Sequence, residues 1–350
     1  MMTDKEIAKI QFGLDSFGDI PVDENGKLFT HAEAIRQVVK EAVLADSLGV
    51  DVIALGEHHR PDFSISSPET VLAGIASVTK NIKLASGVTV LSSDDPVRVF
   101  ERFATLDALS NGRAQIILGR GSFTESFPLF GYDLTDYETL FEEKVELFSQ
   151  LLKEGPVTWE GTMRAALKDA DVYPKTESGH LQTMIGVGGS PQSVVRAAHY
   201  GFPLMLAIIG GSPERFVPYI DLYKRAAKEF GTETHPVGMH SPGFIADTDK
   251  EARDTAWPAH KANFDRIGKT RGWTPMKRDH FIDEVENGSL YIGSVETVAQ
   301  KIAKSIKTLG VERFDLVYGG GPMAASARLK HIQLYGEKVI PRVREILAEK

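Results

Sequence analysis

Two imidazole side chains stand next to a carboxylate at Glu57, His58 and His59, where an apolar run ends. An imidazole exchanges protons near neutral pH, so these residues fit general acid–base catalysis or substrate binding. A structural hydrogen-bonding role also fits them. A metal site is disfavoured, because neighbouring histidines point in different directions and no Asp, Glu or His pair lies nearby at helical ligand spacing. The sequence therefore indicates a metal-free site.

Arg120 stands between two glycines, Gly119 and Gly121, just after another apolar run. Glycine lets the backbone approach a ligand closely, and an arginine at such a place can clamp a phosphate or a carboxylate. The alternative is an arginine that forms an ion pair across the top of the fold. This segment alone does not decide between the two.

A glycine-rich turn with two hydroxyl residues spans residues 186–193, where a predicted strand passes into a predicted helix. The amides around Gly188 and Gly189, with the hydroxyls of Ser190 and Ser193, could form an anion pocket at the helix N-terminus. The segment is not a dinucleotide-binding fingerprint, because its sixth position is proline where glycine or alanine is needed. A plain glycine turn is the alternative.

Each of these segments follows a short apolar run that is typical of a buried strand, and eight such strands alternate with helices. Strand–helix–strand units imply parallel strands with right-handed crossovers. A doubly wound open sheet would also alternate, but eight units with short connections favour an α/β fold of the closed (β/α)8 TIM-barrel type with insertions. The predicted strands are Ile10–Leu14, Val50–Leu55, Ile82–Ser86, Ala114–Leu118, Thr183–Val187, Leu204–Ile209, Val237–Ala246 and Phe314–Tyr318.

The starts of the helices predict where in such a barrel the site lies. Four helices begin with a capping residue followed by proline, which suits the first position of a helix. In a barrel all four junctions lie at the C-terminal ends of the strands, where active sites are built. The junctions are Ser67–Pro68, Asp95–Pro96, Ser190–Pro191 and Ser212–Pro213.

No composition shift or flexible linker divides the chain, so residues 1–350 are expected to form one barrel domain. Two stretches, at about 154–179 and 268–293, break the alternation and predict insertions. We expect the first to contain turns and short extended pieces, and the second is rich in charge and glycine.

Composition limits the class of protein. With 42% hydrophobic and 25% charged residues the chain is an ordinary globular protein, and no apolar run approaches the roughly 18 residues of a membrane span. A net charge of −8 without a basic run disfavours nucleic acid as a partner. The absence of cysteine excludes disulfides and thiolate metal sites, and fits a cytoplasmic protein. A small-molecule substrate is the expected partner.

Taken together, these segments resemble the bacterial-luciferase-like flavin-dependent monooxygenases. The resemblance covers nearly the whole chain and is most specific from Ala85 to Phe123. It also includes the turn Gly56–His59, the stretch Ile185–Ile209 and the last strand. The resemblance implies a (β/α)8 barrel that holds flavin at the C-terminal ends of its strands. It further implies loosely bound reduced flavin mononucleotide (FMN), supplied by a flavin reductase, and a flavin hydroperoxide formed with dioxygen.

By the same resemblance, four residues acquire roles at the flavin. His58 matches the histidine that acts as a base and supports the hydroperoxide. Gly87 and Val88 match the non-proline cis peptide behind the flavin ring. Arg120 matches the arginine that binds the phosphate.

The remaining matches lie on two later strand ends. Ser190 and Ser193 match the two hydroxyl residues on the helix that receives the phosphate, while Ala207 and Ile208 match the strand end that lines the ring. One departure is Gly189, which stands where the luciferases have a glutamate beside the first hydroxyl residue.

The resemblance thus implies a monooxygenase that uses reduced FMN and dioxygen on a small organic substrate, in a family that is commonly homodimeric. Two alternatives stay open. One is a dehydrogenase of the same superfamily that transfers hydride from its substrate to a deazaflavin coenzyme. The other is a non-catalytic flavin-binding protein, as some luciferase relatives are.

Overall fold

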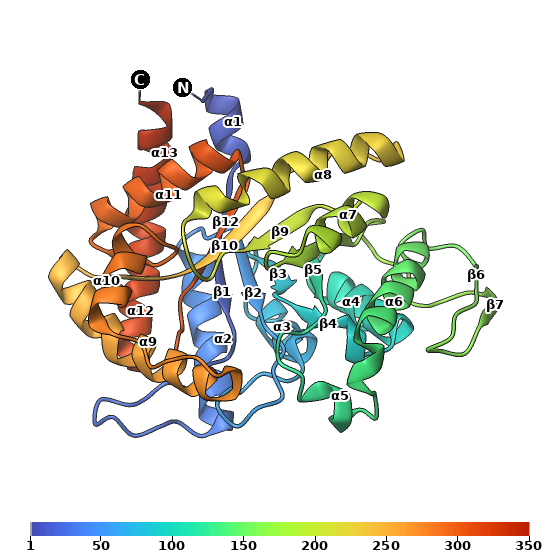
Figure 1. Ribbon diagram of the computed structural model, residues 1–350, viewed down its shortest axis with the longest axis horizontal. Coiled ribbons are helices and arrows are strands. Elements are labelled where there is room, and N and C mark those ends of the chain that lie inside the picture. Colours follow the sequence, from blue (N-terminus) through green and yellow to red (C-terminus); the bar gives the residue numbers. More distant parts are fainter. Residues whose placement is uncertain (1, 350) are drawn as a thin grey trace.

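The computed structural model describes residues 2–349, and their central element is a closed barrel of eight parallel strands (Figure 1). The predicted TIM-barrel fold is therefore confirmed, and each of the eight predicted strands is present with its bounds shifted by at most a few residues. The barrel strands are β1 (Gln11–Ser16), β2 (Val52–Leu55), β3 (Lys83–Ser86), β5 (Ala114–Gly119), β8 (Gln182–Val187), β9 (Leu204–Ala207), β10 (Gly238–Ile245) and β12 (Arg313–Val317).

The barrel closes because every strand pairs in parallel with a neighbour on both sides. The order runs from β1 through β2, β3, β5, β8 and β9 to β10, and then through β12 back to β1. Two very short strands extend this sheet: β4 (Thr89–Val90) pairs with β5, and β11 (Tyr291–Gly293) pairs with β10.

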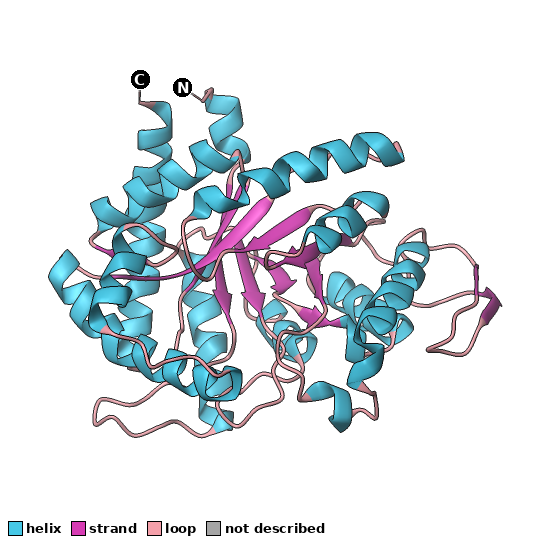
Figure 2. Ribbon diagram, viewed as in Figure 1, coloured by secondary structure: helices cyan, strands magenta, loops and turns pink. Residues whose placement is uncertain are grey.

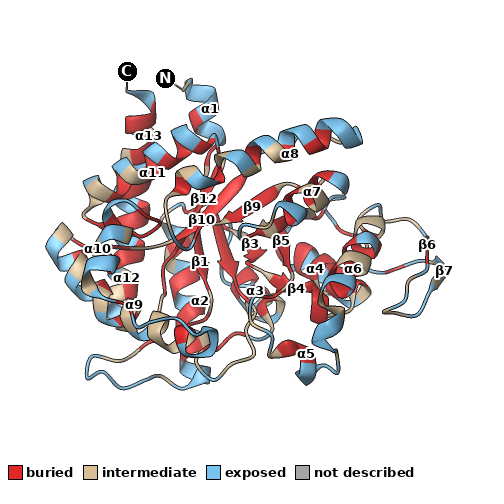
Figure 3. Ribbon diagram, in the orientation of Figure 1, coloured by how far each residue is buried: buried red, intermediate tan, exposed pale blue. Residues whose placement is uncertain are grey.

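Helices surround the strands, as Figure 2 shows, and turn their buried faces toward them (Figure 3). The main helices between strands show the apolar spacing that the sequence predicts, so their buried residues form one continuous core with the outer faces of the strands. The helices are α1 (Asp4–Lys9), α2 (His31–Ser47), α3 (Pro68–Ala76), α4 (Pro96–Leu109), α5 (Ser126–Leu129), α6 (Tyr137–Leu151), α7 (Pro191–His199), α8 (Val217–Phe230), α9 (Asp249–Arg271), α10 (Arg278–Glu286), α11 (Val295–Leu309), α12 (Ala325–Leu334) and α13 (Ile340–Ala348).

Helices α12 and α13 are joined by a single π-helical segment, Tyr335–Val339, and three short 3₁₀ segments lie at Leu91–Ser93, Leu134–Asp136 and Pro213–Phe216. No helix within residues 2–349 combines the length and the apolarity that crossing a bilayer requires.

The two stretches that break the sequence pattern differ in structure. Residues 154–179 form a loop with a small antiparallel ribbon, β6 (Val157–Trp159) and β7 (Leu167–Ala170), which stands out beside α6 in Figure 1. Residues 268–293 instead contain the end of α9, the whole of α10 and strand β11. Their charge and glycine content concealed this regular structure, because α10 is short and buries only Phe281 and Val285.

The four predicted proline-led helix starts all lie after barrel strands, but only two use the predicted cap. The Asp95 carboxylate accepts from the first amides of α4, and the Ser190 hydroxyl accepts from the Ser193 amide of α7. Ser67 and Ser212 make no such cap; their hydroxyls donate to Glu69 and Glu214.

The barrel interior is polar toward the N-terminal ends of the strands. Arg313 on β12 donates from Nε to Asp315 Oδ1 at 2.9 Å and from Nη2 to Asp315 Oδ2 at 2.5 Å. Its Nη1 donates to Gln115 Oε1 on β5 at 2.9 Å. On β1 a Cβ at Gly13 would lie 2.1 Å from Asp315 Oδ1, so glycine is needed there. These polar side chains fill the barrel interior near the N-terminal ends of the strands. A ligand therefore has to enter at the C-terminal ends.

Candidate active site

The residues that the sequence assigns to the site lie on successive strand ends around the mouth of the barrel. The side chain of Val88, which follows β3, connects them. A Cβ at Gly119 would lie 2.5 Å from Val88 Cγ2, and one at Gly186 would lie 3.0 Å from Val88 Cγ1. Val88 therefore packs between the end of β5, where Arg120 begins the next loop, and the end of β8, which leads to the glycine turn.

The peptide bond between Gly87 and Val88 is cis, as the resemblance implied. Gly87 lies directly over the barrel interior: a Cβ there would be 3.1 Å from the Ala54 Cβ and 3.2 Å from Asp15 Oδ2. The cis peptide thus packs closely on β1 and β2, and glycine is the residue that fits there.

His58 lies in an aromatic cluster formed by Phe17, Phe63 and Phe123. Its ring stacks on Phe63 with the centroids 4.2 Å apart, and the rings of Phe123 and Phe17 lie 5.4 Å and 5.6 Å away. Burial in this apolar cluster lowers the pKa of His58 from 6.5 to about 4, so the ring is neutral at neutral pH. Its Nδ1 is buried and has no hydrogen-bond partner within residues 2–349. His58 is thus a neutral imidazole without a structural hydrogen bond at that nitrogen.

His59 has the structural role that the sequence left open for the histidine pair. Its Nε2 lies 2.8 Å from Glu57 Oε1, and Glu57 Oε2 accepts from the Val90 amide at 2.8 Å. Burial raises the pKa of Glu57, although these hydrogen bonds oppose the shift. Glu57 and His59 therefore fix the backbone after β2 and β4, while His58 points into the aromatic cluster.

Arg120 takes part in an ion pair in this structure. Its Nη1 forms an ion pair with Glu138 on α6. Its guanidinium carbon Cζ lies over the ring of Tyr137, 5.5 Å from the ring centroid. The second oxygen of Glu138 lies 3.5 Å from Nη2 of Arg196 on α7. Glu138 thus contacts two arginines beside α7. Because its side chain is 62% exposed, water screens both ion pairs.

The N-terminus of α7 presents amides that no acceptor occupies. Within the part of the chain that the structure describes, the amides of Gly189 and Ser190 donate no hydrogen bond. Gly189 has a φ of +120°, which favours glycine and explains why a glutamate does not stand there. The Ser190 hydroxyl is partly exposed and the Ser193 side chain is buried beneath it. These groups could hold an anion, with Ser190 nearest to solvent.

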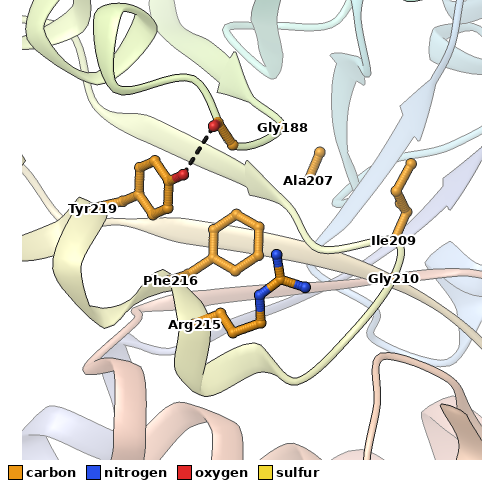
Figure 4. A pocket seen from close by; sticks show the side chains of 8 residues that line it. Gly188, Ala207, Ile209, Gly210, Arg215, Phe216 and Tyr219 are labelled. Carbon is orange, nitrogen blue, oxygen red and sulfur yellow. Dashed lines mark hydrogen bonds between the residues drawn. The ribbon is translucent and has the colours of Figure 1, made fainter.

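Gly188, Gly189 and Ala207, three of the residues assigned to cofactor binding, line one pocket of about 280 Å³ (Figure 4). Ile209 lines it too and is 60% exposed, whereas the side chain of Ile208 is fully buried in the core outside the barrel. In this structure Ile209 therefore occupies the lining position that the resemblance gave to Ile208.

Two residues of this pocket that sequence reasoning missed are Arg215 and Tyr219. The guanidinium of Arg215 points into the hollow in Figure 4, and Tyr219 donates from its hydroxyl to the Gly189 carbonyl at 2.8 Å. Arg215 follows the proline-led start at Ser212, which was the available signal for a residue near the site.

A third omission is a pair of charged or titratable residues within predicted strands, Asp15 on β1 and His240 on β10. Asp15 Oδ2 lies 2.6 Å from His240 Nδ1, and both side chains point into the barrel. An acidic residue and a histidine inside otherwise apolar strands were the signal that sequence reasoning passed over. Among residues 2–349 no three His, Cys, Asp or Glu side chains converge on a point that could hold a metal.

Comparison with known proteins adds to this geometry. A family model described as luciferase-like monooxygenase matches residues 17–313. The alkanal monooxygenase alpha chain of Photorhabdus luminescens is 27% identical over 245 residues, which cover 67% of this chain and 65% of that protein. The present chain thus matches just under two thirds of the length of that relative.

Two solved structures share the fold. One is the oxygenating constituent of 3,6-diketocamphane monooxygenase from a plasmid of Pseudomonas putida, in complex with FMN, with a TM-score of 0.77, 19% identity, and coverage of 95% of this chain and 99% of that one. The other is the coenzyme F420-dependent tetrahydromethanopterin reductase of Methanopyrus kandleri, with a TM-score of 0.72, 22% identity and the same coverage. At these identities the likeness concerns the fold alone.

Proposed function

Because the chain belongs to the family of luciferase-like monooxygenases, we propose that it is a flavin-dependent oxidoreductase, and specifically a monooxygenase that uses reduced FMN and dioxygen on a small organic substrate. The observation that carries this proposal is the group of anion-binding elements at the barrel mouth. Arg120 and Arg196 meet at Glu138, and the amides of Gly189 and Ser190, which lead into α7, donate no hydrogen bond among residues 2–349. A phosphate suits this arrangement, because it accepts hydrogen bonds from guanidinium groups and from helix N-termini alike.

The residues present also suit the ring of a flavin. Gly87 packs closely on Ala54 and Asp15, and Ala207 on a nearby strand end lines the pocket beside α7, so small residues border the place where the ring would lie. Bound there, the flavin would supply the reducing equivalents and the reaction with dioxygen. Arg120 and the amides of Gly189 and Ser190 would bind and orient its phosphate, and the cluster around His58 would exclude water.

His58 is the residue to which we assign proton transfer with the substrate. Its ring is neutral at neutral pH and so has a lone pair that can accept a proton, although burial makes the protonated ring costly. The surrounding phenyl rings suit an organic substrate of low polarity, because they provide apolar surface on three sides of the imidazole.

The experiment that tests the proposal is an anaerobic titration of the protein with reduced FMN, and in parallel with reduced F420, followed by admission of air. Saturable binding of reduced FMN, with flavin oxidation that depends on added substrate, supports a monooxygenase. Binding of F420 alone would contradict it and indicate a deazaflavin-dependent dehydrogenase, the alternative that the shared fold keeps open. Flavin binding without turnover of any oxidisable substrate would indicate a non-catalytic flavin-binding protein, and binding of neither would refute all three.

We also propose a cytoplasmic homodimer that receives reduced FMN from a separate flavin reductase. Support for the dimer comes from exposed apolar side chains on three adjacent helices or their ends: Val43 on α2, Val78 after α3 and Leu109 on α4. Light scattering on the purified protein tests it, and a monomeric mass at micromolar concentration would contradict it.

A further inference from the structure

The barrel interior holds two buried carboxylates, and only one of them is neutralised by an arginine. Asp315 receives hydrogen bonds from both Nε and Nη2 of Arg313. Asp15, which is fully buried, has one side-chain partner, His240, at 2.6 Å from Oδ2, and its Oδ1 has no partner among residues 2–349. Burial raises the pKa of Asp15, and the hydrogen bond with His240 opposes that shift.

His240 has one nitrogen on Asp15 and the other free for a ligand. Its Nδ1 faces Asp15, while Nε2 makes no hydrogen bond to any residue that the structure describes and is not sealed from solvent. The side chain keeps 8% of its surface exposed. Arg313 and Gln115 fill the barrel interior near the N-terminal ends of the strands. The exposed part of the His240 side chain therefore faces the C-terminal mouth of the barrel.

The pair lies against the residues assigned to the flavin ring. Asp15 Oδ2 is 3.2 Å from the position of a Cβ at Gly87. His240 is the register partner of Ala207 on the neighbouring strand, so their side chains lie side by side on the inner face, and Ala207 lines the pocket of Figure 4. The ring of Phe17 lies near both histidines: its centroid is 6.0 Å from that of His240 and 5.6 Å from that of His58.

The charged groups around His240 come from two neighbouring strands. Asp15 on β1 touches it, and Asp315 on β12 is its register partner, with Arg313 bonded to Asp315. Its neighbour on β9 is Ala207, and the ring of Phe17, which follows β1, packs against it, so neither adds charge. Asp315 and Arg313 offset each other, which leaves Asp15 as the titratable group in direct contact with His240.

We propose that Asp15 and His240 form a proton-holding pair in this site, in which His240 Nε2 contacts the bound flavin ring and stabilises its reduced, electron-rich form. Asp15 is a positioning residue that holds the imidazole by Nδ1–H and stabilises the imidazolium. The pair would only hold or move a proton: the N–H bond at Nε2 would break as one forms to a ring nitrogen or to water, and nothing is oxidised or reduced in that transfer. This inference rests on the proposed function, because it takes the ligand at the mouth to be a flavin.

The decisive measurement is the ratio of the dissociation constants of oxidised and reduced FMN, determined anaerobically by fluorescence quenching from pH 5.5 to 8.5. Loss of a charge-assisted hydrogen bond that favours the reduced ring should lower this ratio at least about tenfold in His240→Asn. The asparagine amide can still donate to Asp15, so this variant removes Nε2 while keeping the buried carboxylate paired. The ratio should also lose its dependence on pH in this variant.

Two further variants complete the test. Asp15→Asn should lower the ratio as well, because the imidazolium loses its counter-charge. His180→Asn, at an exposed position in the loop before β8, should leave the ratio unchanged and serves as the matched control. A ratio within twofold of the wild-type value in both His240→Asn and Asp15→Asn would overturn the proposal.

Nitrogen NMR of the wild-type protein, labelled on its histidines, provides a measurement that depends on neither flavin nor the folding of a variant. We expect neutral His240 to carry its proton on Nδ1, facing Asp15, and its lone pair on Nε2; the opposite tautomer would refute the pair. If the wild type binds neither FMN nor F420, the proposed function and the flavin contact both fail. If it binds flavin but the ratio does not respond to His240, only this inference fails.

Discussion

Replacing Arg120 by glutamine should weaken the binding of reduced FMN by about 10- to 150-fold. A charge-assisted hydrogen bond contributes about 1.5–3 kcal/mol, and each 1.4 kcal/mol changes a dissociation constant tenfold. In the structure the guanidinium is already placed beside α7 by Glu138 and Tyr137, so little ordering is needed when the phosphate arrives.

Glu138, the ion-pair partner of Arg120, provides a second variant that tests the same contact. Its carboxylate occupies the guanidinium that the phosphate would use, so Glu138→Gln should tighten FMN binding. The gain is small, because the pair is exposed on the Glu138 side and such pairs are worth about 0.2–1 kcal/mol, which corresponds to at most about fivefold. In the double variant most of the benefit of Glu138→Gln should disappear, because Glu138 bonds Arg120 directly and lies farther from Arg196.

The assay is an anaerobic titration of each variant with reduced FMN and, separately, with reduced riboflavin, which is the same ring without the phosphate. Riboflavin should bind all variants with nearly the same affinity. Arg98→Gln, which removes a 74% exposed arginine on α4, controls for the loss of one surface cation. Unchanged FMN affinity in Arg120→Gln, or an equal loss for riboflavin, would refute the assignment of Arg120 to the phosphate.

Three other predictions concern single side chains. His58→Asn should lower substrate turnover by about 10²- to 10⁴-fold with little change in FMN affinity, which parallel kinetics and titrations check; an equal loss of affinity would instead place the imidazole at the flavin. Burial lowers the pKa of His331 from 6.5 to about 3, so the unfolded state alone takes up this proton at pH 5, and the wild type should lose about 2 kcal/mol more stability than His331→Asn between pH 7.5 and pH 5. Urea unfolding at both pH values measures this difference, and equal losses would contradict it. Arg328→Met should destabilise the fold by about 3–5 kcal/mol in the same assay, because it removes the hydrogen bonds of the buried guanidinium to the carbonyls of Asp19, Gly319 and Gly321 and a positive charge that favours the ionised forms of Asp19 and Glu41; a loss below 1 kcal/mol would contradict this role.

The sequence determined the fold and the end of the barrel at which to search. Eight apolar runs separated by helices with regular apolar spacing leave few arrangements other than a closed parallel barrel, because buried strands of this kind need helices on their outer face. The proline-led helix starts then placed the site at the C-terminal strand ends. The roles of Arg120 and Ser190 came from the resemblance, since the residues alone also fitted an ion pair and a glycine turn.

Only the tertiary structure decided which side chains face one another. It separated His58 from His59, although they are neighbours in sequence, because one turns into the phenylalanine cluster and the other toward Glu57. It brought Asp15 and His240 together across 225 positions of the chain. Strand periodicity predicts that a residue faces the barrel interior, but contact between two strands depends on their register and on the closure of the barrel. That closure pairs β10 with β12 and β12 with β1, and no local pattern in the sequence encodes it.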